Sequence, residues 1–131
     1  MTKDEQEVLQ ANEAFYEAFE AGDIGAMDAC WAREAPIACL HPGWEPLLGR
    51  EAVMHSWRGI LLGGGAPGAI RCERAVARVS GDCAWVVCRE VLPAGSLVAT
   101  NVFQREGGAW RMVHHHASPM PPPRPAPRMS N

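Results

Sequence analysis

Apolar residues recur with two different periods along this chain, and the change of period divides it into two halves. Up to about residue 62 they recur every three or four positions, which is typical of amphipathic helices. Residues 63–68, which contain four glycines and a proline, interrupt this pattern. Beyond them apolar residues recur at every second position, as in half-buried strands. Helices followed by strands predict an α+β domain.

Three helices are predicted in the first half. Thr2-x-x-Glu5 has the pattern of a capping box and predicts the start of the first helix. Asp23 is a typical N-cap for a short second helix. A third, amphipathic helix is predicted after Gly49, and residues 37–40 are predicted as a short strand before it.

Four antiparallel strands are predicted in the second half, at residues 70–79, 83–91, 97–105 and 109–118. Gly107-Gly108 between the last two strands is a strong signal for a two-residue hairpin. With these glycines at the turn centre, Asn101 is expected opposite His114, and Ala99 opposite His116.

The last strand carries the candidate chemistry, together with the turn His41-Pro-Gly-Trp44. Period-2 alternation places two histidines on the same face as two apolar residues, and this set is Trp110, Met112, His114 and His116. Imidazoles titrate near neutral pH, and their presence beside apolar walls is typical of a small-molecule site. The same alternation predicts that His115 points to the outer face.

Composition narrows the class of protein. One domain is expected from 131 residues, and the acidic first twenty residues argue against a signal peptide, so a cytoplasmic location is expected. No apolar run is long enough to span a membrane. Residues 1–65 carry four basic and eleven acidic side chains, whereas 66–131 carry eight basic and four acidic ones. These arginines are scattered rather than clustered, which argues against a nucleic-acid partner.

Two further features limit what the chain is expected to do. The five cysteines contain no C-x-x-C pair, so neither a disulfide framework nor a zinc knuckle is indicated, and no cofactor is expected. Residues 119–131 contain six prolines and are expected to form an extended tail outside the folded domain of residues 1–118. The P-x-x-P spacing in this tail resembles an adaptor-domain ligand, although a passive tail is the favoured interpretation.

The chain resembles the nuclear-transport-factor-2-like superfamily, specifically its SnoaL-like and ketosteroid-isomerase-like bacterial branch. The resemblance rests on residues 14–23, on His41-Pro-Gly-Trp44, on 49–57 and on 103–118, and it extends over residues 4–118. It implies a cone-shaped fold in which three N-terminal helices pack on a strongly curved, mostly antiparallel sheet around an apolar pocket. It also implies a homodimer formed through the outer sheet face.

The resemblance does not extend to ketosteroid isomerase activity. Aligned on Gly22-Asp23, Phe15 falls at the position of the isomerase tyrosine, and Tyr16 is expected to point elsewhere. Cys39 falls at the position of the base and Asn101 at that of the second oxyanion donor. The Tyr/Asp/Asp set of that enzyme is therefore absent.

The predicted site consists of polar and apolar groups in one cavity. His41 or His114 is expected to act as general acid or base, and Asn101 to donate a hydrogen bond to a carbonyl oxygen. The expected ligand-binding residues are Phe15, Trp31, Trp57, Met112 and His116, with Arg50 receiving a carboxylate at the rim.

Several functions remain open from the sequence. A small-molecule-binding domain without catalysis is the first interpretation, and an isomerase, cyclase or dehydratase acting on a small apolar carbonyl compound is the alternative. A metal site on His114-x-His116 with His41 is less favoured, because no nearby acid would orient the imidazoles. The dimer face is expected to consist of Arg71, Ala75, Val87, Val98, Val102, Val113 and His115.

Overall fold

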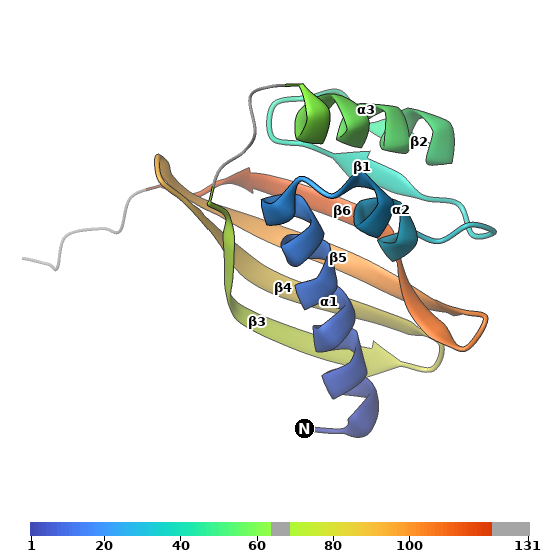
Figure 1. Ribbon diagram of the computed structural model, residues 1–131. Coiled ribbons are helices and arrows are strands. Elements are labelled where there is room, and N and C mark those ends of the chain that lie inside the picture. The colour runs from blue at the N-terminus through green and yellow to red at the C-terminus, as the bar shows by residue number, and fades with distance from the viewer. Residues whose placement is uncertain (64–68, 122–131) are drawn as a thin grey trace, which may run out of the picture.

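The computed structural model describes residues 1–63 and 69–121 and shows three helices against one six-stranded sheet (Figure 1). The helices are α1 (Lys3–Ala21), α2 (Ile24–Cys30) and α3 (Arg50–Leu62). The strands are β1 (Ala38–Leu40), β2 (Leu47–Leu48), β3 (Arg71–Ser80), β4 (Cys83–Leu92), β5 (Gly95–Glu106) and β6 (Ala109–Pro119). This arrangement confirms the predicted α+β fold class.

Local sequence signals set the ends of the first two helices. At the start of α1 the Thr2 hydroxyl accepts from the Glu5 backbone N–H, and the Glu5 carboxylate accepts from the Thr2 backbone N–H, both at 3.0 Å. Gly22 ends the helix in a left-handed conformation with φ of 66°. Asp23 then caps α2 by accepting from the backbone N–H of Ala26.

The sheet has the strand order β2-β1-β6-β5-β4-β3. Strands β3 to β6 form three consecutive antiparallel hairpins, whereas β1 pairs in parallel with β6. The two-residue strand β2 was not predicted, because two leucines before Gly49 are too short a pattern to distinguish from a loop.

The core lies between α1 and the concave face of the sheet, with α2 and α3 closing one side (Figure 1). Its largest side chains have no more than 1% of their surface exposed, and among them are Phe15, Trp31, Trp57, Phe103 and Met112. The prediction that α1 lies against the curved sheet with Phe15 and Trp57 buried is confirmed. The four expected wall residues, Phe15, Trp31, Trp57 and Met112, all lie in this interior.

A β-bulge in β6 corrects the predicted register of the last hairpin. Phe103 lies opposite Met112, but the register shifts at the next pair and Val113 is the extra residue. Asn101 therefore lies opposite His115, not His114. Because side chains alternate between the faces of a strand, a one-residue shift moves every following residue of β6 to the other face.

The outer face of the sheet carries an exposed apolar patch, which we call the outer patch. It consists of Val76, Trp85, Val87 and Val98, with 37–45% of each residue's surface exposed. Val113 and His115, which we expected on this face, are buried instead. In the parts of the chain that the structure describes, the helices are too short or too polar to cross a membrane. The glycine-rich break at 64–68 and tail residues 122–131 lie outside the described residues.

Candidate functional site

The bulge at Val113 turns His115 into the core, where it meets Asn101 on the neighbouring strand. His115 is 1% exposed and Asn101 is fully buried. The Nδ1 atom of His115 lies 2.6 Å from Oδ1 of Asn101. An amide oxygen only accepts hydrogen bonds, so Nδ1 of His115 carries the proton and Nε2 has a free lone pair.

Two further polar side chains from α1 and β4 complete a buried cluster. The Tyr16 hydroxyl donates to Oε2 of Glu90 over 2.7 Å and accepts from Nδ2 of Asn101 at 3.2 Å. The Nε2 atom of His115 lies 3.8 Å from the same Glu90 oxygen. We call Tyr16, Glu90, Asn101 and His115 the polar cluster. It joins one helix to three strands by side-chain contacts.

Burial favours the neutral forms of the titratable groups in the polar cluster. Desolvation raises the pKa of Glu90, although its hydrogen bond from Tyr16 acts in the opposite direction. Desolvation, with smaller contributions from the other histidines, lowers the pKa of His115 to about 3. The pKa of Tyr16 is raised by burial and by the neighbouring Glu90. Burial therefore favours the protonated form of the Glu90 carboxyl group, which lies beside an imidazole with a free lone pair.

His41 lies beside the polar cluster at the end of β1. Its Nε2 is 3.0 Å from Oγ of Ser56, which donates its own proton to the carbonyl of Val53 over 2.7 Å. Nε2 of His41 is therefore the donor, and Nδ1 keeps the lone pair. Burial lowers the pKa of His41 to about 4. The His41 ring is 6.4 Å from that of His115, between centroids.

Aromatic rings connect His41 both to the surface and to the core. Its centroid lies 4.8 Å from the Trp44 ring and 4.8 Å from the Trp57 ring. Trp44 is 51% exposed, whereas Trp57 is fully buried. The three rings thus form a continuous series from solvent to the interior, and Trp57 in turn packs against Phe15 at 5.5 Å and His115 at 6.1 Å.

One buried hydrogen-bond donor beside these rings has no partner. The indole Nε1 of Trp57 is buried and makes no hydrogen bond with any described residue. The same is true of Trp31 and Trp110. A buried N–H without an acceptor costs free energy, which a bound oxygen atom would recover. Trp57 is therefore a buried donor without an acceptor among the described residues.

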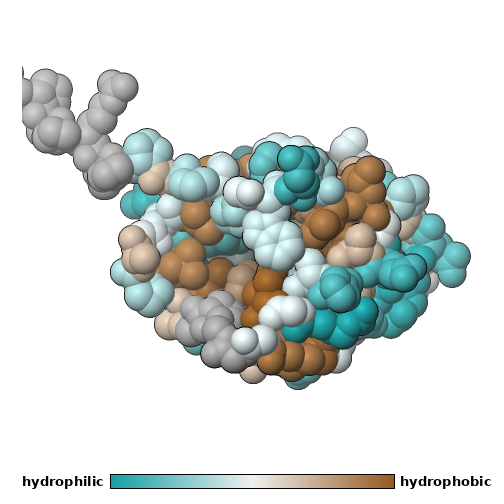
Figure 2. Space-filling view, turned by 90° about the horizontal axis from the view of Figure 1, so that it is seen from above, coloured by the Kyte–Doolittle hydropathy of each residue, from teal (hydrophilic) through white to brown (hydrophobic). Residues whose placement is uncertain are grey.

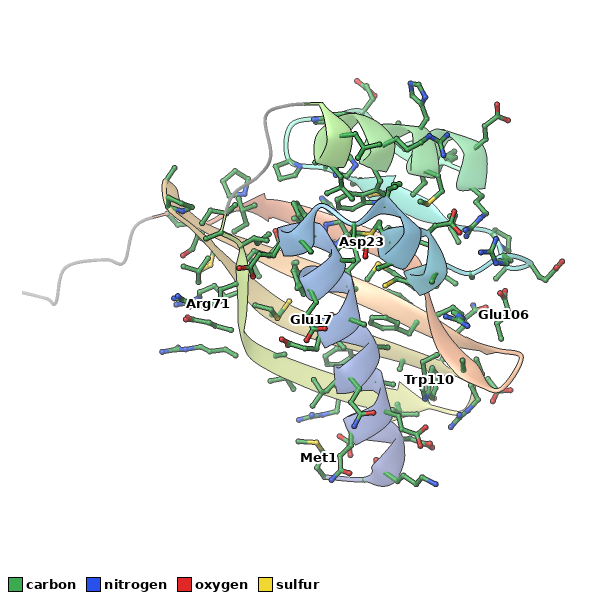
Figure 3. All side chains as sticks on the ribbon, viewed as in Figure 1. Met1, Glu17, Asp23, Arg71, Glu106 and Trp110 are labelled. Atoms are coloured by element: carbon green, nitrogen blue, oxygen red, sulfur yellow. The ribbon has the colours of Figure 1, made fainter. Side chains whose placement is uncertain are left out.

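The end of the sheet where β3 begins and β4 turns into β5 carries a surface pocket of about 290 Å³. It is lined by Glu20, Ala69, Ile70, Arg71, Val91, Leu92 and Pro93. Figure 3 shows Arg71 at this end and Trp110 and Glu106 at the opposite end. Seen from above, apolar side chains also lie in a hollow near the middle of the molecule (Figure 2). Glu90 is two residues from Leu92, so this pocket reaches the strand that carries the buried carboxyl group.

The predicted shared cavity of His41 and His114 is wrong. His114 is half-buried and pairs with Val102 on the outer face, and its neighbour His116 is exposed. Their rings lie 6.3 Å apart on the side of the sheet opposite the polar cluster. The bulge at Val113 is the physical reason, because it reverses the faces of the three histidines. The same geometry contradicts the alternative metal site, because His114 and His116 lie on the outer face whereas His41 lies inside the cone.

Arg50 does not serve as a rim residue for a carboxylate. Its guanidinium donates to the carbonyls of Asp28, Trp31 and Ala32 at 3.0–3.1 Å and forms an ion pair with the Asp28 carboxylate at 2.8 Å. These carbonyls belong to the end of α2 and the residues after it, where a cation complements the helix dipole. Arg50 therefore ties the start of α3 to the end of α2.

Sequence reasoning missed two members of the polar cluster. Glu90 alternates with Ala84, Val86 and Cys88, and a lone carboxylate on the apolar face of a strand was the available signal. Tyr16 was expected to point away, but it is 3% exposed and directs its hydroxyl into the cluster. The side chain of Phe15 fills the adjacent position, so α1 presents both aromatic residues to the core.

Comparisons with known proteins agree with this fold. A family model described as a SnoaL-like domain matches residues 8–123. Among curated proteins, the F-box protein SKIP8 of Arabidopsis thaliana is 28% identical over 115 residues, which are 86% of this chain. The aligned region is 49% of that relative, so the chain spans about half of its length.

Solved structures show the same similarity. A candidate dehydratase of the NTF2-like family from Streptomyces avermitilis is 34% identical, with a TM-score of 0.78 over 91% of this chain and 97% of that one. A candidate calcium/calmodulin-dependent protein kinase type II association domain from Thiobacillus denitrificans is 40% identical, with a TM-score of 0.72 over 85% of this chain and 93% of that one. These matches confirm the superfamily that the sequence resembles.

Proposed function

The chain belongs to the SnoaL-like domain family, and we propose that it binds a small, neutral, largely apolar compound that carries a carbonyl group. This proposal is drawn from the site itself, because the fold of the family hosts many functions. The main support for this proposal is the indole N–H of Trp57, which is buried and has no acceptor among the described residues. It lies beside two neutral histidines, His41 and His115. A carbonyl oxygen is the acceptor that such a donor requires.

The charges of the interior support a neutral ligand. The buried polar side chains of the described chain are Asn12, His41, Ser56, Glu90, Asn101 and His115, with no lysine or arginine among them. A carboxylate ligand would enter an apolar space without a cation and beside a glutamate, at a large desolvation cost. Arg50, the cation that sequence analysis assigned to a carboxylate, is occupied by α2.

Binding is tested with cyclohexanone as the probe, followed through the indole N–H resonances of the protein. We expect the Trp57 resonance to move in a saturable way, while that of Trp110, at the other end of the sheet, stays in place as an internal control. Cyclohexanecarboxylate should produce no shift at Trp57. Equal shifts at both tryptophans, or none at Trp57 with any neutral ketone, would refute the proposal.

A second variant measures the contribution of the donor itself. Trp57→Phe keeps an aromatic wall and removes the N–H group. Its affinity for cyclohexanone, followed by backbone amide shifts, should fall by roughly three- to tenfold, as expected for one net hydrogen bond. An unchanged affinity would place the ketone elsewhere in the molecule.

A catalytic role for the same site is the second candidate, and the pairing of Glu90 with His115 favours it. Their environments favour a protonated carboxyl group and a free imidazole lone pair 3.8 Å apart. In an enolisation, His115 Nε2 would take the proton from the carbon next to the carbonyl as the C–H bond breaks. Glu90 would give its proton to the carbonyl oxygen, and reversal of both transfers would return the ketone.

Exchange of the α-hydrogens of cyclohexanone in D₂O tests this second candidate by NMR. Catalysed exchange should fall at least roughly 100-fold in His115→Gln and in Glu90→Gln, the usual effect of removing a general acid or base. His114→Gln, on the outer face, is the matched control and should retain the rate. Binding without exchange would leave the chain as a binding domain.

We also propose that the protein forms a homodimer through the outer patch. The exposed side chains of Val76, Trp85, Val87 and Val98 support this proposal, since a contiguous apolar patch on a sheet face is typical of a protein interface.

A further inference from the structure

We propose that Asn12 is a positioning residue that fixes which nitrogen of His115 carries the proton. Asn12 lies on α1, is 1% exposed, and accepts from Nδ2 of Asn101 through its Oδ1 over 2.8 Å. It does not touch His115. The importance of this role for ligand chemistry rests on the proposed function, whereas the protonation of His115 itself does not.

The hydrogen bonds around Asn101 form a chain with one direction. Asn12 Oδ1 is only an acceptor, so the group of Asn101 that faces it must be the amide nitrogen. The oxygen of Asn101 then faces His115, whose Nδ1 must donate. The Tyr16 hydroxyl agrees with this direction, because it gives its one proton to Glu90 and accepts from Asn101.

The same four side chains of the polar cluster have a second, reversed arrangement. If the Asn101 amide turned by 180°, its nitrogen would donate to Nδ1 of His115, and Tyr16 would donate to the Asn101 oxygen. His115 would then carry its proton on Nε2 and donate it towards Glu90. Every member of the polar cluster would still be satisfied, so these four residues alone do not select one arrangement.

Asn12 is the residue that distinguishes the two arrangements. In the reversed one, the Asn101 oxygen would face the Asn12 oxygen, and two acceptors would be buried against each other. Asn12 is held from its other end, where Nδ2 donates to Sγ of Cys72 over 3.5 Å. It also lies one helical turn before Tyr16, so α1 places both contacts to Asn101 on one face.

The consequence is a free lone pair on the inward nitrogen of His115. Nε2 faces the Glu90 carboxyl group and is available to accept a proton. In the reversed arrangement this atom would be an N–H donor and would have no basic function. A helix residue without ligand contact would thus decide whether His115 acts as a base.

The test is ¹⁵N NMR of the histidine side chains in the full-length protein, without any ligand. Wild-type His115 should show protonated Nδ1 and unprotonated Nε2 at neutral pH. Asn12→Leu, of similar size but without an acceptor, should change the ratio of the two tautomers towards Nε2–H by about fivefold, the effect of one net hydrogen bond. Asn12→Asp retains the acceptor oxygen, so His115 should keep the wild-type tautomer in this variant.

Glu13→Gln, at an exposed position of α1 next to Asn12, is the matched control, because it leaves the contacts of Asn12 with Asn101 and Cys72 in place. Its His115 tautomer should be that of the wild type. An unchanged tautomer in Asn12→Leu would overturn the proposal. A proton on Nε2 of His115 in the wild type would overturn it as well, and that measurement does not depend on the folding of any variant. Failure of cyclohexanone to bind would refute the proposed function and leave this result intact.

Discussion

Replacing His41 with glutamine should remove much of the protein's sensitivity to mild acid. Burial lowers the pKa of His41 from 6.5 to about 4, so the folded state resists its protonation. A group with a lowered folded-state pKa contributes stability that is present above its unfolded pKa and is lost as the pH falls through the folded value. For His41 this window is pH 6.5 to 4.

The size of the effect follows from the same pKa change. A fall from 6.5 to about 4 corresponds to about 2–3 kcal/mol of unfolding free energy between the two ends of the window. Glutamine does not titrate and can still donate to Ser56 Oγ, the present partner of the imidazole. Between pH 6.5 and pH 4, the free energy of unfolding should therefore fall by about 2–3 kcal/mol less in His41→Gln than in the wild type.

Urea unfolding followed by tryptophan fluorescence, at several values between pH 7 and pH 4, measures this difference. His115 and Glu90 also titrate with shifted pKa values, and because both are present in both proteins their contributions cancel except for the smaller part of the His115 shift that His41 causes. His55→Gln, at an exposed position of α3, is the control and should follow the wild type. Parallel loss of stability in the wild type and His41→Gln would refute the assigned burial of His41.

Three further changes test other parts of the structure. Burial raises the pKa of Glu90, which opposes folding as the pH rises above the ordinary value of 4.5, so Glu90→Gln should gain stability relative to the wild type as the pH increases in urea unfolding. Arg50→Lys loses the guanidinium that donates to three carbonyls. Its free energy of unfolding should fall by about 2–3 kcal/mol, with cyclohexanone affinity unchanged. Trp85→Lys places a charge in the outer patch and should give the single-chain mass in sedimentation, whereas the proposed dimer predicts about twice 14.2 kDa for the wild type.

The helices and the four consecutive antiparallel strands were predictable because their signals are local. The Thr2 capping box, the Asp23 cap and the Gly107-Gly108 turn each act over a few residues, and each forms as its pattern predicts. The burial of Phe15 and Trp57 followed from helical spacing in the same way.

The candidate site was less predictable because it depends on one bulge. Residues 110–116 alternate just as well with or without an extra residue at Val113, and only packing against β5 decides between the two registers. The choice reverses the faces of His114 and His115. Glu90 was visible as a carboxylate on an apolar strand face, but its contact with Tyr16 joins residues 74 positions apart, which no local pattern reveals.

A crystal structure of the protein soaked with cyclohexanone tests most directly whether the interior next to the polar cluster binds a ligand. We expect ring-shaped density inside the cone, with the ketone oxygen within hydrogen-bond distance of Trp57 Nε1 and the ring against His41 and His115. Density only outside the cone, with Phe15, Trp57 and His115 in their present contacts, would contradict the claim and leave the polar cluster as a structural part of the core.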